Sequence, residues 1–287
     1  MIKKLFLLAA LLAPSLAYAG YPSANLSAQV VRAGSGSGAL PGSILPPCPG
    51  GCTWSIAFDD EFNGSGAPGN FATDGVNWSV WSQPYADGTT AWSFANVAGA
   101  VITNCKDAVF ENGGYLHIIP LGSIDVHQGT PTNPGYGCEI GRAGAGPGYW
   151  EAYVNYDNSI GWADADWMCC TGWNGDPQAE MDVFELNGPT QNCTSYAHNY
   201  GITHRLWTAP HYFNSWHNIG ILWEPTSGFS CYVDGVFKGS DNPDNCSVST
   251  PCTNPTTVRV MNGLTQPQFM PNSTGMLVDW IRQYTHP

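Results

Sequence analysis

Basic residues are scarce in this sequence. Nine Lys and Arg stand against 22 Asp and Glu among 287 residues, for a formal net charge of −13. Lys3 and Lys4 lie together at the N-terminus, and the other seven are scattered: Arg32, Lys106, Arg142, Arg205, Lys238, Arg259 and Arg282. Binding along a phosphate backbone needs clustered cations, so the sequence argues against a nucleic-acid partner. A sulfated polymer would be repelled for the same reason. We therefore expect an uncharged partner.

Long apolar runs are also lacking. The longest begins at Leu5, directly after the two N-terminal lysines, and ends near Ala13. Ala17-Tyr18-Ala19 then offers a small-residue cleavage site before Gly20. The run is too short to span a bilayer as a stable helix. We predict a signal peptide over 1–19, secretion to an extracellular or periplasmic space, and no membrane partner.

Helix-forming runs of Ala, Leu, Glu and Lys are few, whereas the chain has 34 Gly, 22 Pro, 12 Trp and 13 Tyr. Residues 20–52 are rich in Gly, Ser and Pro, which predicts a flexible lead-in, pinned at its end by Cys48 or Cys52. From residue 53 onward, short alternating runs predict strands at 115–119, 149–153, 181–186, 218–223, 230–233 and 276–284. Val233-Asp234-Gly235-Val236 predicts a hairpin. We expect one all-β domain over 53–287, a two-sheet β-sandwich or jelly roll, acting as a monomer.

Ten cysteines follow the predicted signal. An even number in an exported chain predicts a disulfide framework. Cys48-x-x-x-Cys52 stands alone and Cys169-Cys170 is vicinal, so no second pair stands at zinc-site spacing. Disulfides are therefore favoured over zinc, and the sequence leaves their pairing open.

The segment Glu180-Met181-Asp182-Val183-Phe184-Glu185 carries the most chemistry. Side chains alternate along a strand, so Glu180 and Asp182 share a face, whereas Glu185, at i+5, would face the other way. One bulge residue near Val183 or Phe184 would return Glu185 to the acidic face. The two glutamates could then bring their carboxyls to roughly 5 to 6 Å, the separation of a retaining rather than an inverting glycosidase.

This arrangement predicts a pair of catalytic carboxylates. Glu180 would attack the anomeric carbon, and Glu185 would protonate the leaving oxygen and later activate water. Asp182, between them, would assist and help keep Glu185 protonated. Spacing alone also allows the two glutamates to exchange roles. The bland alternative is an acidic, solvated sheet face, which the strongly apolar residues between the acids disfavour.

At these positions the chain resembles glycoside hydrolase family 16, the laminarinase-type jelly rolls with the signature E-x-D-x-x-E. The resemblance runs from about Trp54 to Tyr284. Beside the acidic hexapeptide, four segments carry it: FDDEFN at 58–63, GYLHI at 114–118, YWEA at 149–152 and VDWIR at 278–282. The run WHNIGILW at 216–223, followed by YVDG at 232–235, is similar to the family's hairpin.

The resemblance implies a concave substrate cleft, with Glu180 as nucleophile, Asp182 as assisting acid and Glu185 as acid/base. It also implies a structural calcium held by the Asp279 side chain and by backbone oxygens near Glu61 and Gly114, and oxygen ligands suit that ion. No cofactor is expected for catalysis.

Sugar rings present flat C–H faces that stack on indoles, so a glycan cleft needs exposed tryptophans. Four tryptophans flank the acidic strand or the loop after it and are the candidates for substrate binding: Trp162, Trp167, Trp173 and Trp207. Core packing is the alternative for each. By the same resemblance His198 would orient a carboxylate or a sugar hydroxyl.

The sequence thus predicts a secreted endo-glycosidase that cuts internal β-1,3 or mixed β-1,3/1,4 linkages of a neutral β-glucan. An agarase-like endo-β-galactanase is the nearest enzymatic alternative. The same fold also serves in non-catalytic glucan-binding modules, in which the glutamates are typically replaced.

Overall fold

The computed structural model describes residues 39–67, 72–81, 109–118, 138–155, 162–169, 179–187, 190–197, 202–210, 215–242, 245–253, 256–264 and 276–287. One 3-10 turn, Pro49–Gly51, is the only helical element among them. These residues contain no helix with the length and apolarity needed to cross a bilayer. All the other regular elements of the described residues are antiparallel strands, which confirms the predicted all-β class.

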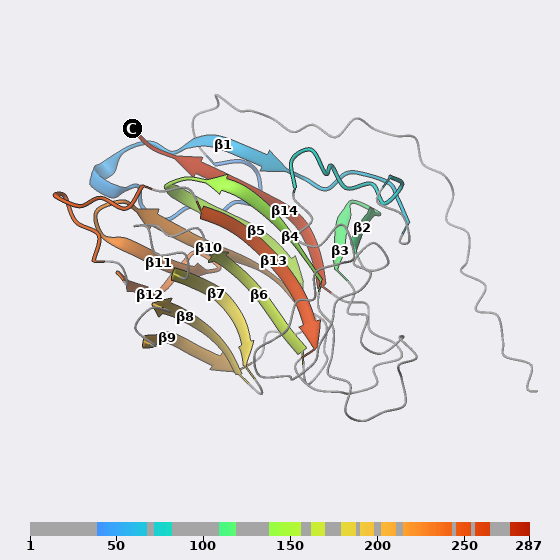
Figure 1. The fold of residues 1–287 in the computed structure, drawn as a ribbon. Coiled ribbons are helices and arrows are strands. Elements are labelled where there is room, and N and C mark those ends of the chain that lie inside the picture. The colour runs from blue at the N-terminus through green and yellow to red at the C-terminus, as the bar shows by residue number, and fades with distance from the viewer. Residues whose placement is uncertain are drawn as a thin grey trace, which may run out of the picture.

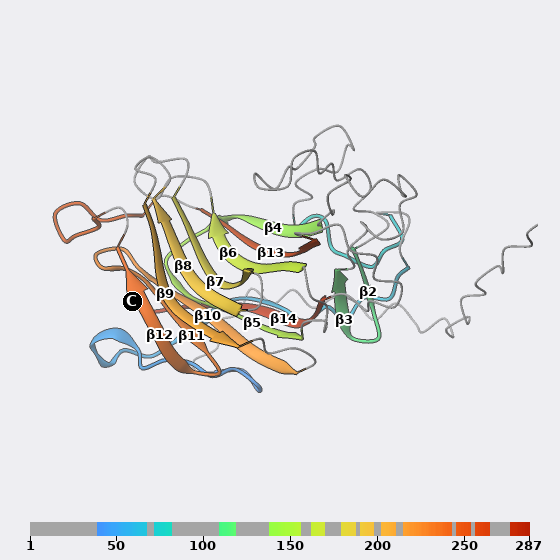
Figure 2. The same cartoon turned by 90° about the horizontal axis from the view of Figure 1, so that it is seen from below.

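The strands form two layers (Figures 1 and 2). The larger sheet has, in spatial order, β12 (Val236–Asp241), β11 (Gly228–Val233), β10 (Trp216–Glu224), β5 (Gly148–Asn155), β14 (Met276–Thr285), β3 (Tyr115–Ile118) and β2 (Val109–Asn112). β1 (Ser55–Asp60) also pairs with β14. The smaller sheet has the order β4 (Cys138–Ala145), β13 (Thr256–Leu264), β6 (Trp162–Cys169), β7 (Ala179–Asn187), β8 (Thr190–Ala197) and β9 (Ile202–Pro210).

Alternation along the strands produces the core between the sheets. From β5, Trp150, Ala152 and Val154 enter it, and from the smaller sheet Met181 is fully buried in it. The predicted hairpin is present: Val233 pairs with Val236 across Asp234 and Gly235, whose φ angles of 51° and 72° are those of a two-residue primed turn. The predicted strands therefore follow from periodicity and turn chemistry.

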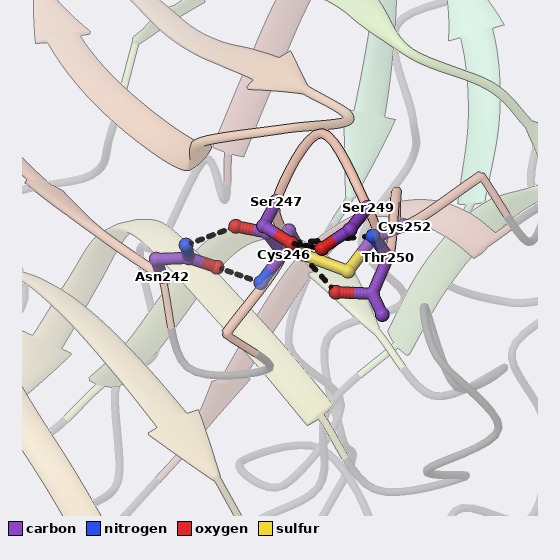
Figure 3. Close-up of a disulfide and its surroundings, with 6 residues drawn as sticks. All are labelled: Asn242, Cys246, Ser247, Ser249, Thr250 and Cys252. Carbon is purple, nitrogen blue, oxygen red and sulfur yellow. Dashed lines mark hydrogen bonds between the residues drawn. A yellow bond between two sulfur atoms is a disulfide. The ribbon is translucent and has the colours of Figure 1, made fainter.

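Two disulfides close local loops. Cys48 pairs with Cys52, and Cys246 pairs with Cys252, while Cys231 is also disulfide-bonded. In the second loop the Asn242 amide accepts from the Cys246 N–H at 2.7 Å and donates to its carbonyl at 2.8 Å (Figure 3). The two disulfides support the predicted disulfide framework, and the Asn242 hydrogen bonds hold Cys246 of the second loop beside the residue that follows β12.

The outer face of the larger sheet, which points away from the smaller one, is partly covered by residues 39–53, here called the strap (Figure 2). The Tyr284 hydroxyl accepts from the Leu40 N–H at 3.1 Å, and the Asn218 amide donates to the Gly42 carbonyl at 3.0 Å. The Ile44 N–H donates to Glu151 at 2.8 Å. The expectation of a flexible lead-in is therefore wrong for 39–52. Side chains on the sheet face form hydrogen bonds with the backbone of the strap, and the composition of the segment alone cannot predict these bonds.

The Cys48–Cys52 bond is local, so it does not join the strap to the sheet. Burial does that: Leu40, Leu45 and Cys48 pack on a second apolar cluster built around Trp54, Tyr149 and Tyr284. Residues 20–38 of the predicted lead-in lie outside the described part of the chain.

Glu151 lies beneath the strap with 1% of its surface exposed. Burial raises its pKa from 4.5 to about 7, although the Ile44 N–H and the Arg282 charge act the other way. Between about pH 4.5 and 7 the folded chain thus holds a proton that the unfolded chain has lost, so the free energy of unfolding falls as pH rises through this window.

We expect Glu151→Gln, which is neutral at every pH, to flatten this dependence by up to about 1.4 kcal/mol per pH unit. Urea unfolding at pH 5, 6, 7 and 8 measures the slope for both proteins. Asp59, whose pKa burial and Glu61 raise to about 6, keeps part of the slope in the variant. An equal slope in variant and wild type would contradict the assignment.

Candidate active site

The acidic hexapeptide lies in β7, in the middle of the smaller sheet. On the β6 side, Trp167 pairs with Asp182 while Asp166 pairs with Phe184, so β7 has one extra residue at Val183. On the β8 side, Asp182 pairs with Thr194 and Glu185 pairs with Asn192, again one residue too many on β7. The bulge expected from the i+5 spacing is therefore present in both ladders.

The bulge brings the three acidic positions to one face. Glu180, Asp182 and Glu185 pair in turn with Cys169, Trp167 and Ala165 of β6, which are two residues apart and so share a face. On β8 their partners are Tyr196, Thr194 and Asn192, again in steps of two. Met181, between the first two acids, is fully buried in the core. Positions 180, 182 and 185 thus belong to the face of the smaller sheet that is turned away from the core.

The strand register places the described tryptophans predicted to bind sugar on different faces of the smaller sheet. Position 167 faces Asp182 across the β6–β7 ladder, on the acidic face. Trp162 begins β6. Positions 162 and 167 differ by an odd number on a strand without a bulge of its own, so position 162 belongs to the opposite face from position 167. Trp173 and His198 lie outside the described residues.

Trp207 lies on the core side of β9. A bulge puts it opposite Cys193, out of step with Asn192 and Thr194. Its half-buried ring packs against the core, and the Lys238 ammonium lies 5.0 Å from the ring centroid. This is the core-packing alternative named for the tryptophans, and the position does not support sugar binding by Trp207.

Two of the three positions expected to hold calcium, Asp279 and Glu61, come together at the edge of β14. β1 pairs with β14 as far as Asp60–Ile281, and β3 pairs with the same edge from Val278–Leu116 onward, which leaves Asp279 between them. Asp279 is also the extra residue of a bulge against β5. Asp279 and Glu61 line one pocket of about 550 Å³, which also holds Asp59, Asp60 and Asn63. Gly114 is not among the lining residues and lies one residue before Tyr115, at the start of β3.

The lining of this pocket is rich in carboxylates, which favours a bound cation. Burial and the negative charge of Glu61 raise the pKa of Asp279, against the effect of Arg282. Arg282 is the counter-charge present: its guanidinium donates to Asp59 at 3.0 Å and to Glu61, and the same group donates to the Pro41 carbonyl and the Ser43 hydroxyl of the strap, both at 2.8 Å. Burial disfavours its charge, but Glu61 and Asp59 raise the pKa of Arg282 above its usual value. The donor set fits calcium, and its occupancy stays a prediction.

No zinc centre emerges in the described ranges. The one group of three His, Cys, Asp or Glu residues with ligand atoms within 4.8 Å of one another is Cys48, Cys52 and His286. Because the two cysteines form a disulfide, they offer no thiolate.

Comparisons with known proteins agree on the fold. No family model matches the sequence, and no curated protein matches it. Among solved structures, SCLam, a non-specific endo-β-1,3(4)-glucanase from family GH16, superposes with a TM-score of 0.63 at 17% identity, over 90% of this chain and 98% of that chain. β-Agarase A from Zobellia galactanivorans gives a TM-score of 0.60 at 19% identity, over 85% and 97%.

A laminarinase from Flavobacterium sp. UMI-01 gives a TM-score of 0.59 at 18% identity, over 80% of this chain and 100% of that one. The chain thus has the jelly-roll fold of GH16 glycoside hydrolases. At these identities the likeness shows the fold alone.

Proposed function

We propose that this chain is a secreted, retaining endo-glycosidase of the GH16 type that hydrolyses internal β-1,3 or mixed β-1,3/1,4 linkages of a neutral glucan. One observation carries the proposal: the bulge in β7, which puts positions 180, 182 and 185 on a single face. The similar structures support the ligand class, since an SCLam mutant holds 1,3-β-D-cellobiosyl-glucose at its active site and a LamA variant from Z. galactanivorans is in complex with laminaritriose and laminaritetraose. The disulfides are consistent with export.

The mechanism is a double displacement. Glu180, as carboxylate, attacks the anomeric carbon while Glu185 donates its proton to the departing glycosidic oxygen. Glu185, now a carboxylate, removes a proton from water, and the hydroxide attacks the same carbon and expels Glu180. The carboxylate of Asp182, between them on the same face, disfavours early ionisation of Glu185 by charge repulsion. Each step inverts the anomeric carbon, so the product keeps the β configuration.

Calcium, where bound, would have a structural role at Asp279 and Glu61, on the larger sheet. Asp279 within β14 and Glu61 directly after β1 would hold it, and neither takes part in the proton transfers.

A product assay tests the proposal. Incubated with laminarin, lichenan and agarose, the protein is expected to release oligosaccharides of mixed length from laminarin or lichenan, and proton NMR of the first products should show the β-anomer before mutarotation. Release from agarose alone would favour the galactanase alternative. Initial formation of the α-anomer would overturn the assigned roles, and binding without any release would leave a glucan-binding module.

A further inference from the structure

The outer face of the larger sheet divides into two halves. The strap covers the half around Tyr149, Leu222 and Tyr284. The other half comprises β3, the start of β14, the end of β5 and the start of β10. Strand alternation places Tyr115, Tyr153 and Trp216 on this half, because Leu116, Val154 and Ile219 enter the core instead.

These side chains form a continuous aromatic row. The ring centroids of Tyr115 and Trp216 are 5.2 Å apart, and those of Trp216 and Tyr153 are 5.0 Å apart. Tyr153 stacks in turn on Trp280 at 5.8 Å. Planes tilted by only 22° to 33° between neighbours make the row close to parallel.

The row has a buried end and an accessible part. Trp280 is 3% exposed, enclosed by Gly42 of the strap and by the Arg282 guanidinium 4.0 Å from its ring centroid. Tyr115, Tyr153 and Trp216 are half-buried, so part of each of these three neighbouring aromatic residues reaches solvent. A fold that needed them only as packing could have covered them as it covers Tyr149 and Tyr284.

Polar groups flank the accessible part. Tyr153 belongs both to the row and to the wall of the 550 Å³ pocket, where Asn63 and Asp279 stand beside it. Half-buried Asn155 pairs with Trp216 on the other side. Aromatic surface bordered by amides and carboxylates matches a polyhydroxylated chain, whose C–H faces pack on rings and whose hydroxyls donate to oxygen acceptors. The carboxylates would repel an anionic polymer.

We propose that Tyr115, Trp216 and Tyr153 form a second glycan-binding surface, which holds a neutral β-glucan chain on the sheet opposite the acidic strand. The ligand class rests on the proposed function. The surface itself does not depend on it, because binding there requires no hydrolysis. Such a surface would keep the protein on an insoluble or very long polymer while β7 acts on another stretch of it, and linked contacts raise overall affinity without changing either site.

The test uses the full chain with Glu180→Gln, so that the polymer stays intact. Affinity electrophoresis through laminarin and lichenan compares this parent with the same chain carrying Trp216→Ala or Tyr115→Ala. Each added substitution is expected to weaken retention about 3- to 10-fold, the loss of one stacking contact. The matched control is Phe237→Ala, which removes an aromatic residue that is 54% exposed on β12, outside the row, and should leave retention unchanged.

A second measurement covers the chance that Trp216→Ala impairs folding. Hydroxyl-radical labelling of the parent, with and without laminarin oligosaccharides, should show protection of Tyr115 and Trp216 by the sugar and none of Phe237. Equal retention of parent and row variants, with no protection, would overturn the second surface. A change of oligomeric state without loss of glucan binding would also overturn it, since the row would then be a contact between copies.

The two proposals fail separately. If the wild type hydrolyses laminarin but the row variants bind like the parent, the proposed activity stands and the second surface is contradicted. If the wild type cleaves none of the polymers but its glucan binding still depends on Trp216, the second surface stands and the proposed activity is contradicted.

Discussion

Glu180→Gln is expected to lower the release of reducing sugar from laminarin by about 10⁴-fold or more. Gln has the shape of Glu but no negative charge, so it cannot form the glycosyl ester, and binding of the polymer should persist. The β7 bulge predicts a similar loss for Glu185→Gln, because both residues belong to one face with Asp182. The matched control is Glu224→Gln, at the end of β10, where the amide can still bond His286. Activity in Glu180→Gln within about tenfold of wild type would contradict the assignment.

Azide would identify which glutamate is the nucleophile. With an activated aryl β-glycoside, Glu180→Ala should give the α-glycosyl azide, since azide attacks the substrate directly in one inversion. Glu185→Ala should give the β-glycosyl azide, since Glu180 reacts first and azide then displaces it. The opposite outcome would mean that the two glutamates exchange roles, which their spacing in the sequence allows.

Arg282→Met is expected to destabilise the fold by about 3 to 5 kcal/mol. The residue is 3% exposed, and its guanidinium donates to Asp59 and Glu61 on one side and to Pro41 and Ser43 of the strap on the other. Met fills a similar volume but leaves the buried Asp59 carboxylate without its counter-charge. Denaturation in guanidinium chloride measures the change in the free energy of unfolding.

Lys238→Met provides the control, because it also removes one cation lying over an aromatic ring. Lys238 lies over Trp207 and pairs with no carboxylate in the described structure. Its loss should cost no more than about 1 kcal/mol. If Arg282→Met were as mild as Lys238→Met, the ion pairs of Arg282 would add no net stability, as can happen when the cost of desolvation equals the gain in attraction.

The acidic strand could be predicted because its signal is local. An i+5 spacing between two glutamates, interrupted by apolar residues, has one simple solution on a strand, and the ladders on both sides of β7 show the extra residue at Val183. Hairpin geometry at Asp234-Gly235 is local in the same way. Both predictions needed no knowledge of what lies across the sheet.

Features that depend on distant partners could not be predicted. The strap is rich in Gly and Pro, and its order depends on Tyr284, Glu151 and Asn218, which are far away in sequence. Trp207 is a candidate for sugar binding by its place after the acidic strand, whereas a bulge in β9 turns it to the core. The aromatic row was missed because Tyr115, Tyr153 and Trp216 come from three separate strands, and only sheet order makes them neighbours.

The place of β14 has a consequence for biosynthesis. This last strand, Met276–Thr285, lies inside the larger sheet, with β5 on one edge and both β3 and β1 on the other. The sheet therefore cannot close until residues up to Thr285 have been synthesised, and the pairing of β1 with β14 joins residues more than 200 positions apart. Until β14 pairs, the larger sheet stays open, so export as proposed above would pass an unclosed chain through a narrow translocon, with the native fold forming on the far side.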